Sequence, residues 1–265
     1  MVALIDRIRH PPAPGAEMPF LDHLEELRWR LLWALLAIVV GSGFGIWAVM
    51  HFDVLGLLID PIRPHLETGK LTYLSPSDPF FLTLRLGLTV GFLLASPVVM
   101  YQLWSFVAPA LLPSEKRAIV PSLYLGLVLF AGGVAMAYYI ALPITLEFFM
   151  TTFQVESLEA QIVAGQYLSL VVKMLIAFGA IFEVPVVVLV LSAMGLVTSA
   201  FLREKRRYAI AGMAILAALL TPGDVITLTI MMMLPLIILY ELSIGLAVMM
   251  ERRRVRTAEV EASEA

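Results

Sequence analysis

The stretch FLDHLEELRWR at residues 20–30 runs directly into the apolar segment LLWALLAIVVGSGFGIWAVMHF at residues 31–52. If this stretch is helical, its leucines share one face, while His23, Glu26 and Arg30 share another. The pattern predicts an amphipathic helix that lies at a membrane surface and leads into a membrane-spanning helix. Glu26 and Arg30 are four residues apart, so an ordinary ion pair on the helix surface is the simpler interpretation of these two charges.

The composition indicates an integral membrane protein. Of the 265 residues, 60% are hydrophobic and the mean hydropathy is +0.92, against roughly 45–50% apolar residues in a soluble domain. Residues 1–18 are polar and lack the pattern of a cleaved signal peptide, so we expect an uncleaved anchor. The sequence contains no cysteine, which excludes disulfides, thiolate metal sites and thiol nucleophiles.

Charge distribution predicts the topology of the chain. Of the 18 Lys and Arg residues, 14 flank the apolar stretches on one side; Arg63 and Lys70 lie in loops on the other, and Arg85 and Lys173 lie within spans. By the positive-inside rule, the prediction is an all-α membrane protein with six transmembrane helices and both termini cytoplasmic. The six predicted spans cover residues 31–52, 79–107, 119–142, 167–194, 208–220 and 225–249.

We expect one polytopic membrane domain over residues 1–265. Residues 1–30 form a cytoplasmic N-terminal segment with the amphipathic helix, and residues 31–250 form the bundle of six spans. Residues 251–265 are predicted to be a disordered cytoplasmic tail, because an arginine run is followed there by an acidic end.

The first two spans carry residues with specific packing consequences. Gly41 and Gly45 predict close helix packing, since no strand precedes them and no Lys-Ser/Thr follows to form a nucleotide loop. The span 79–107 is about 43 Å long and should tilt or protrude, with a kink at Pro97. The proline-bearing loop 53–78 before it is long enough for a small cap on the outer face.

Two features of the later spans point to function. Glu183 lies inside the fourth span, where an ionisable group costs about 2.5–3.5 kcal/mol on insertion scales, so it is protonated or partnered by another helix. Lys173 is not that partner, because ten residues separate the two on different faces. A purely structural hydrogen bond across helices is the alternative. The span 208–220 is only about 20 Å long, so we expect local bilayer thinning beside it.

The connection after the second span presents a carboxylate at the inner membrane surface. Pro109 and Pro113 hold residues 104–117 in a defined shape, and Ser114 is placed to cap a helix that begins near Glu115. A capping acid followed by a positive-inside pair is the alternative interpretation.

Four short motifs stand at defined places: LDHLEELRWR (21–30), FVAPALLPSEKR (106–117), FEVP (182–185) and LTPGD (220–224). Together, over about residues 20–254, they resemble TatC, the multi-spanning subunit of the twin-arginine protein translocase. The resemblance implies a concave, glove-like helix arrangement with short helices five and six, in a bacterial or archaeal plasma membrane. It implies a receptor for the twin-arginine signal peptides of folded precursors, driven by proton-motive force. It also implies TatA- and TatB-type single-span partners in hetero- and homo-oligomers, with no enzyme activity, cofactor, metal, nucleotide or nucleic acid.

Carried over residue by residue, the resemblance implies that Glu26 and Glu115 bind the paired arginines. Two positions depart from the family pattern: Leu228 stands where some relatives have a glutamine that helps dock a partner helix, and Lys173 matches no family position. The other implied residues are His23, Arg28, Arg30 and Phe106 for the signal peptide, Glu183 as an intramembrane polar site, Thr221 and Asp224 for partner docking at the periplasmic hairpin, and Pro61, Pro97 and Pro109 for structure.

The chemistry of the residues agrees with such a receptor. A guanidinium presents a planar fork of donors that a carboxylate meets with two parallel bonds, which an ammonium cannot match. The alternative function is a proton-coupled small-molecule secondary transporter, which would also use an intramembrane carboxylate. Such a transporter usually shows internal repeats or paired broken helices, and neither is evident in the sequence. Aspartyl-protease chemistry lacks its second carboxylate, and no zinc motif is present.

Overall fold

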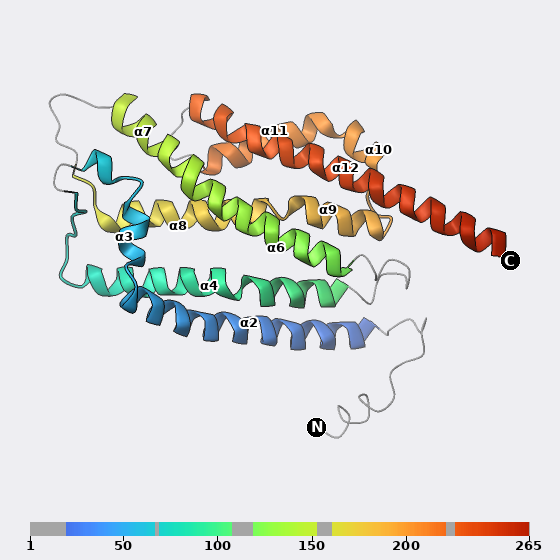
Figure 1. Ribbon diagram of the computed structural model, residues 1–265, viewed down its shortest axis with the longest axis horizontal. Helices are drawn as coiled ribbons and strands as arrows, with labels where there is room; N and C mark the ends of the chain where they lie inside the picture. The colour runs from blue at the N-terminus through green and yellow to red at the C-terminus, as the bar shows by residue number, and fades with distance from the viewer. Residues whose placement is uncertain (1–19, 67–68, 108–118, 153–160, 221–225, 265) are drawn as a thin grey trace, which may run out of the picture.

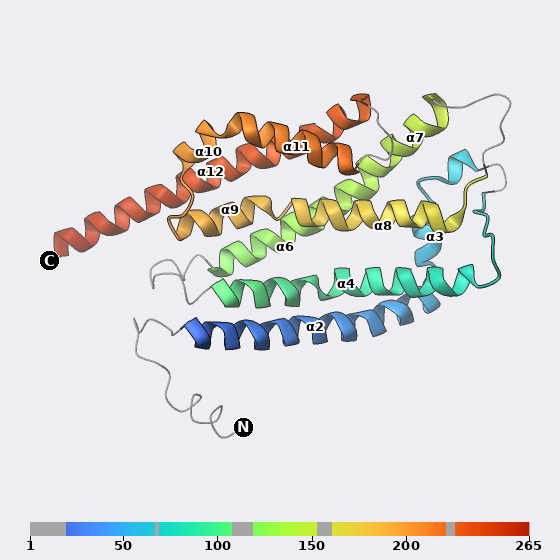
Figure 2. The ribbon, with the colours of Figure 1, turned by 180° about the vertical axis from the view of Figure 1, so that it is seen from behind.

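In a computed structural model, the chain is an elongated bundle of helices (Figures 1 and 2). The structure describes residues 20–66, 69–107, 119–152, 161–220 and 226–264. The elements in chain order are α2 (Phe20–His51), α3 (Val54–Ile59), the 3₁₀ turn η1 (Arg63–His65), α4 (Asp78–Val107), α6 (Ile119–Met136), the π-helical η3 (Ala137–Ala141), α7 (Leu142–Thr152), α8 (Ala164–Ile181), α9 (Val184–Ala193), α10 (Ser199–Glu204), α11 (Arg206–Leu220) and α12 (Ile226–Glu264).

The bundle has two distinct ends (Figure 1). The cap end carries α3 and the starts of α4 and α8, and the loop end carries the start of α2, the end of α4 and α10. Within the described residues, five helical segments are long and apolar enough to cross a membrane. They cover Leu24–His51, Asp78–Phe106, Pro121–Thr151, Ala164–Ala193 and Met232–Arg252.

The remaining predicted span corresponds to α11. This helix has 15 residues, about 22 Å at the α-helical rise, so its described part is shorter than the hydrocarbon core of a bilayer. The short fifth helix predicted from the sequence is therefore present. Six complete spans are not established, because residues 221–225, with Thr221 and Asp224, lie outside the described residues.

Helices α2 and α4 pack backbone to backbone through glycines from both helices. A Cβ added to Gly45 would lie 2.1 Å from the carbonyl oxygen of Gly87, and one added to Gly41 would lie 2.6 Å from that of Gly91. The close packing predicted for Gly41 and Gly45 is confirmed. The glycines that they meet on α4, Gly87 and Gly91, were not predicted from the sequence.

Helix α4 continues through Pro97 as one helix of 30 residues. Proline has no N–H, so Pro97 cannot donate to the carbonyl of Leu93, four residues earlier. The buried hydroxyl of Ser96 donates to that carbonyl instead, at 2.7 Å. A neighbouring hydroxyl thus satisfies the backbone group that the proline frees, which is how helices inside a membrane tolerate proline.

The fourth span was expected to be one helix, and the structure corrects this. It consists of α8 and α9, separated by a turn at Phe182 and Glu183. Pro185 occupies the first turn of α9, where its missing N–H and fixed φ suit a helix start. Proline also disfavours helical backbone in the residue before it, so a new helix begins here.

The loop between the first two spans folds over the cap end, as its prolines and length predicted. Tyr167 of α8 donates its hydroxyl hydrogen bond to the carbonyl of Leu58 at 2.7 Å, and Tyr138 donates to that of Leu57. Pro61 lies between α3 and η1, beside the buried side chain of Ile62. These contacts fix the cap onto the third and fourth spans.

Helix α12, with 39 residues, corrects two expectations, a short sixth helix and a disordered tail. It continues without interruption to Glu264 and extends past the other helices at the loop end (Figure 1). Residues 251–264 contain no glycine or proline and are rich in Arg, Glu and Ala, which have high helix propensity. Local propensity therefore continues the helix through a stretch whose charge pattern alone indicated disorder.

Candidate functional site

Glu26 and Arg30 form an ion pair one turn apart near the start of α2. The Nε atom of Arg30 donates to Oε1 of Glu26 at 2.9 Å, and Nη2 of Arg30 contacts the same oxygen. The two side chains are 22% and 25% exposed, respectively. Arg28 points outward and is exposed. The simpler sequence interpretation, a pair at i and i+4, is therefore correct for the chain on its own.

This pair also shows that the Glu26 carboxylate can bind a guanidinium group. The Glu26 carboxylate already accepts from two nitrogens of one guanidinium, both through Oε1. Hydrogen bonds between charged groups are about twice as strong as neutral ones, and a guanidinium is matched to a carboxylate in shape. A guanidinium from another chain would have to share Glu26 with Arg30 or displace it.

A groove of about 340 Å³ lies between the loop-end half of α4 and α9. Its α4 wall includes Met100, Trp104 and Phe106, and its α9 wall consists of aliphatic side chains. Trp104 is buried, whereas Phe106 is half-buried. The residues that line this inner groove are Met100, Leu103, Trp104, Phe106, Glu183, Val186, Val187, Val190, Leu191 and Met194.

Glu183 is the charged residue of the inner groove and stands at the break between α8 and α9. A Cβ added to Gly126 of α6 would lie 3.0 Å from Oε2 of Glu183 and 2.8 Å from Cε of Met100, so α6 closes the groove from behind. Within the described residues, Oε1 of Glu183 has no hydrogen-bond partner. An acid in an apolar, half-buried setting without a partner is a candidate contact for a polar group on an incoming segment.

The structure brings some of the predicted residues together. Phe106 and Glu183 line the same groove, and Glu26 pairs with Arg30 at the same end of the bundle as the end of α4 (Figure 1). His23 lies in α2, but its side chain is not described. Glu115 and Pro109 fall in residues 108–118, outside the described part of the chain, so the geometry between Glu26 and Glu115 stays a prediction.

Sequence analysis missed several residues of the inner groove. Met100 and Trp104 are four residues apart on α4, and this spacing could have indicated a shared face with Phe106 nearby. Gly126 carried no sequence signal, because a single glycine in an apolar run does not reveal its neighbour. The break at Glu183 could have been inferred from Pro185.

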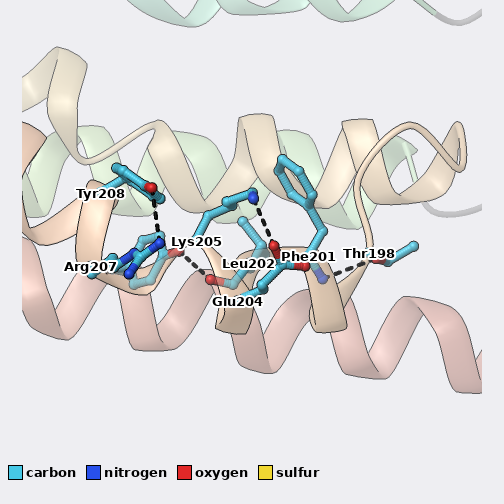
Figure 3. Close-up of polar contacts among 8 residues, drawn as sticks. Thr198, Phe201, Leu202, Glu204, Lys205, Arg207 and Tyr208 are labelled. Atoms are coloured by element: carbon cyan, nitrogen blue, oxygen red, sulfur yellow. Dashed lines mark hydrogen bonds and ion pairs between the residues drawn. The ribbon is translucent and has the colours of Figure 1, made fainter.

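A polar network organises the loop end around α10 (Figure 3). Thr198 caps α10 by accepting from the N–H of Phe201 at 3.2 Å, Lys205 pairs with Glu204 at 2.6 Å, and Arg207 donates to the hydroxyl of Tyr208 at 3.0 Å.

The first residues of α10 and α11 are also tied to α12 by charged groups. Glu251 accepts from both the N–H and the hydroxyl of Ser199 at 2.6 Å, and Arg206 pairs with Glu241 at 2.7 Å. Arg206 and the start of α10 are therefore held against α12. Among the described residues, no cluster of His, Cys, Asp or Glu is placed to hold a metal ion.

Comparison with known proteins identifies close similarity over most of the chain. The family model for Sec-independent protein translocase protein (TatC) matches residues 22–235. The chain is 37% identical over 238 residues to the Sec-independent protein translocase protein TatC of Aquifex aeolicus (strain VF5), covering 89% of this chain and 98% of that one. It is 34% identical over 229 residues to that of Escherichia coli (strain K12), covering 85% and 86% of the two chains.

The fold is also similar to that of a solved structure. A crystal structure described as the twin arginine translocase receptor TatC superposes with a TM-score of 0.75 at 36% sequence identity. The match covers 86% of this chain and 99% of the other. Similarity in sequence and in fold therefore extends over the same large part of the molecule.

Proposed function

The chain belongs to the TatC family of Sec-independent protein translocase proteins, and from this premise we propose that it is the receptor that binds twin-arginine signal peptides. Membership makes it a multi-helix membrane component of a protein translocase. The observation that carries the finer proposal is the Glu26 carboxylate, which already accepts donors from a guanidinium near the start of α2.

In the proposed mechanism, the two arginines of a signal peptide bind one carboxylate each. One guanidinium replaces or shares the place of Arg30 at Glu26, and the other binds Glu115 in the connection after α4. Each hydrogen bond to a charged group contributes roughly 1.5–3 kcal/mol. Two such contacts give about tenfold to a thousandfold preference for arginine over lysine, at about 1.4 kcal/mol per decade.

The apolar segment that follows the arginines is proposed to occupy the inner groove. This groove opens at the same end of the bundle as Glu26, and its walls are apolar except at Glu183. Phe106 lies in the wall nearest the end of α4 and would contact the peptide first. Glu183 would then offer a polar contact inside the membrane, and its carboxyl group is the proposed site of proton coupling.

The remaining features of the proposal follow the family resemblance. The loop end, which carries Arg206 and Arg207, is proposed to be cytoplasmic, together with both termini. Thr221 and Asp224 are proposed to dock TatA- and TatB-type single-span proteins beside the short α11, where the bilayer thins. Transport of folded precursors would use proton-motive force in hetero- and homo-oligomers, in a bacterial or archaeal plasma membrane. The transporter alternative has one supporting feature, the broken fourth span, whereas family membership supports the receptor.

The decisive test is crosslinking of an Arg-Arg signal peptide to the membrane-inserted protein, with a Lys-Lys peptide as the ligand control. Glu26→Lys and Glu115→Lys should each reduce capture at least about tenfold, because a cation replaces the acceptor of a charge-assisted bond. Glu25→Lys is the matched control, since Glu25 is an exposed neighbour with the same charge.

The outcome separates the receptor from its alternatives. Normal capture of the Arg-Arg peptide by the Glu26→Lys/Glu115→Lys double variant would refute the proposed site. Uptake of a labelled small solute into vesicles, with no preference between the two peptides, would favour the transporter instead.

A further inference from the structure

A second groove, distinct from the inner groove, lies on the cap-end half of α4. It has a volume of about 610 Å³ and separates α4 from α8. Phe81, Leu88 and Phe92 of α4 form one wall, and Gly165 and Ile176 of α8 form the other. Leu88 is 48% exposed, so this outer groove opens sideways toward lipid. The proposed receptor function does not use it.

Arg85 gives the outer groove its charge. It lines the α4 wall and is exposed to the groove. The ion pairs made within the described residues use Glu26, Asp60, Glu204 and Glu241, and none of them involves Arg85. A guanidinium within a membrane span pairs with an anion or a polar cavity as a rule.

The nearest acid on the same wall is already used by the backbone. Oδ2 of Asp78 accepts from the N–H groups of Leu74 and Ser75, at 3.0 and 2.9 Å. Asp78 therefore closes the turn that leads into α4, two helical turns away from Arg85. The Arg85 guanidinium therefore has no carboxylate partner among the described residues that line the groove.

The long side chain of Arg85 can reach the level of lipid phosphates from just inside the hydrocarbon boundary. Helix α4 has 30 residues, about 45 Å, against about 30 Å of hydrocarbon, so a centred helix places Asp78 about 7 Å outside. The Cα of Arg85 then lies about 3 Å inside the hydrocarbon boundary, and its long side chain can reach the headgroup layer. Lys173 is exposed on α8 three residues before Ile176, so it is a second cation on that helix, although it does not line the groove itself.

We propose that the outer groove binds one anionic phospholipid of the leaflet at the cap end. Its phosphate pairs with Arg85, supported by Lys173, and an acyl chain lies along Leu88, Phe92 and Ile176. From Arg85 toward the middle of the bilayer, the α4 wall carries Leu88 and then Phe92, so a phosphate at Arg85 places an acyl chain along apolar side chains. An apolar partner helix would leave the guanidinium without a counter-ion, at a cost that disfavours it. The proposal requires membrane insertion only, and not the receptor role.

The test is lipid titration of the purified full-length protein, read by native mass spectrometry. Phosphatidylglycerol and phosphatidylcholine with identical acyl chains are compared, so that only the headgroup charge differs. The unaltered protein should bind one phosphatidylglycerol more tightly than phosphatidylcholine. Arg85→Gln should weaken phosphatidylglycerol binding about tenfold, the loss expected for one charge-assisted contact. Arg63→Gln is the matched control, because Arg63 pairs with Asp60 outside the groove.

A second variant tests the groove without changing its charge. A Cβ at Gly165 meets nothing within 4 Å, so Gly165→Leu should fold normally and fill part of the groove. It should reduce phosphatidylglycerol binding, whereas Arg85→Lys should retain much of it. Circular dichroism checks that each variant keeps its helix content, and if Arg85→Gln does not fold, Arg85→Lys and Gly165→Leu decide the matter.

Three outcomes would overturn the proposal. Equal phosphatidylglycerol binding by the unaltered protein, Arg85→Gln and Gly165→Leu would mean ordinary surface lipid only. Loss of both lipids in Gly165→Leu, with no effect of Arg85→Gln, would show that the groove holds lipid through its apolar walls alone, without selection for an anionic headgroup. Competition by inorganic phosphate at equal concentration would assign the cation to a free anion instead.

Discussion

The two sides of α4 differ in how closely they approach their neighbours. Toward α2, Gly87 and Gly91 bring the backbones into contact, with no room for a Cβ. Toward α9, Met100 and Trp104 hold the backbones apart and leave the inner groove of about 340 Å³. Lipid tails are as apolar as leucine, so close packing rather than hydrophobic burial joins helices in a membrane. Side-chain size along one helix therefore separates a structural contact from a binding surface.

The largest expected effect comes from a substitution that forces apart the closely packed helices α2 and α4. Gly45→Leu places a Cβ only 2.1 Å from the carbonyl oxygen of Gly87, which is closer than the two atoms can approach. Helices α2 and α4 must therefore separate. Overpacking usually costs about 1–3 kcal/mol, and contact with backbone rather than a flexible side chain puts this variant at or above the upper end. Unfolding in detergent micelles, followed by circular dichroism, measures the loss.

The matched control is Gly43→Leu, two residues away on the same helix. A Cβ at Gly43 meets nothing within 4 Å, so this variant should keep nearly full stability. Equal destabilisation by both variants would show that the glycine contact is not what holds the two helices together.

A smaller effect is expected from a substitution that fills the inner groove between α4 and α9. Val187→Trp adds a large side chain to the inner groove, where Val187 is 52% exposed and has room to extend. Stability should hardly change, whereas crosslinking of the apolar part of a signal peptide should fall about tenfold, the equivalent of roughly 1.4 kcal/mol. Val184→Trp is the control, because Val184 is exposed on the same helix but does not line the groove. If both variants bind peptide normally, the groove is not its binding site.

The smallest expected effect concerns the carbonyl of Leu93 on α4, which loses its usual backbone donor because residue 97 is a proline. Ser96→Ala removes the hydroxyl that donates to the carbonyl of Leu93, and Pro97 cannot replace it. The loss should be about 1 kcal/mol, the usual net contribution of one hydrogen bond. Ser169→Ala is the control, because the Ser169 hydroxyl of α8 makes no hydrogen bond within the described residues, and it should have no measurable effect in the same unfolding assay. A Ser96→Ala protein as stable as the original would mean that the carbonyl finds another donor.

The comparison between the two sides also shows where sequence analysis succeeds. Gly41 and Gly45 predicted close packing because a four-residue spacing places both on one face. Glu26 and Arg30 predicted an ion pair for the same reason, and the pair is present. Both inferences concern one helix and its own periodicity.

Predictions that depended on contact between two segments distant in sequence were weaker. The inner groove was not predicted, because α4 and α9 are distant in sequence and only the fold places Phe106 beside Glu183. The break at Glu183 was missed, since continuous hydropathy outweighed the proline two residues later. The helical end of α12 was missed because its charge pattern was weighed without its helix propensity.

The sequence by itself determined that this protein is a multi-span membrane component, that its fifth helix is short, and to which family it belongs. Hydropathy, helix length and local spacing are properties of contiguous residues, so they can be read without a fold. The tertiary structure alone decided which glycines meet, and that an acid lines one groove of α4 while a base lines the other. The physical reason is that contact between helices depends on their relative rotation and depth, which the packing of the whole bundle sets.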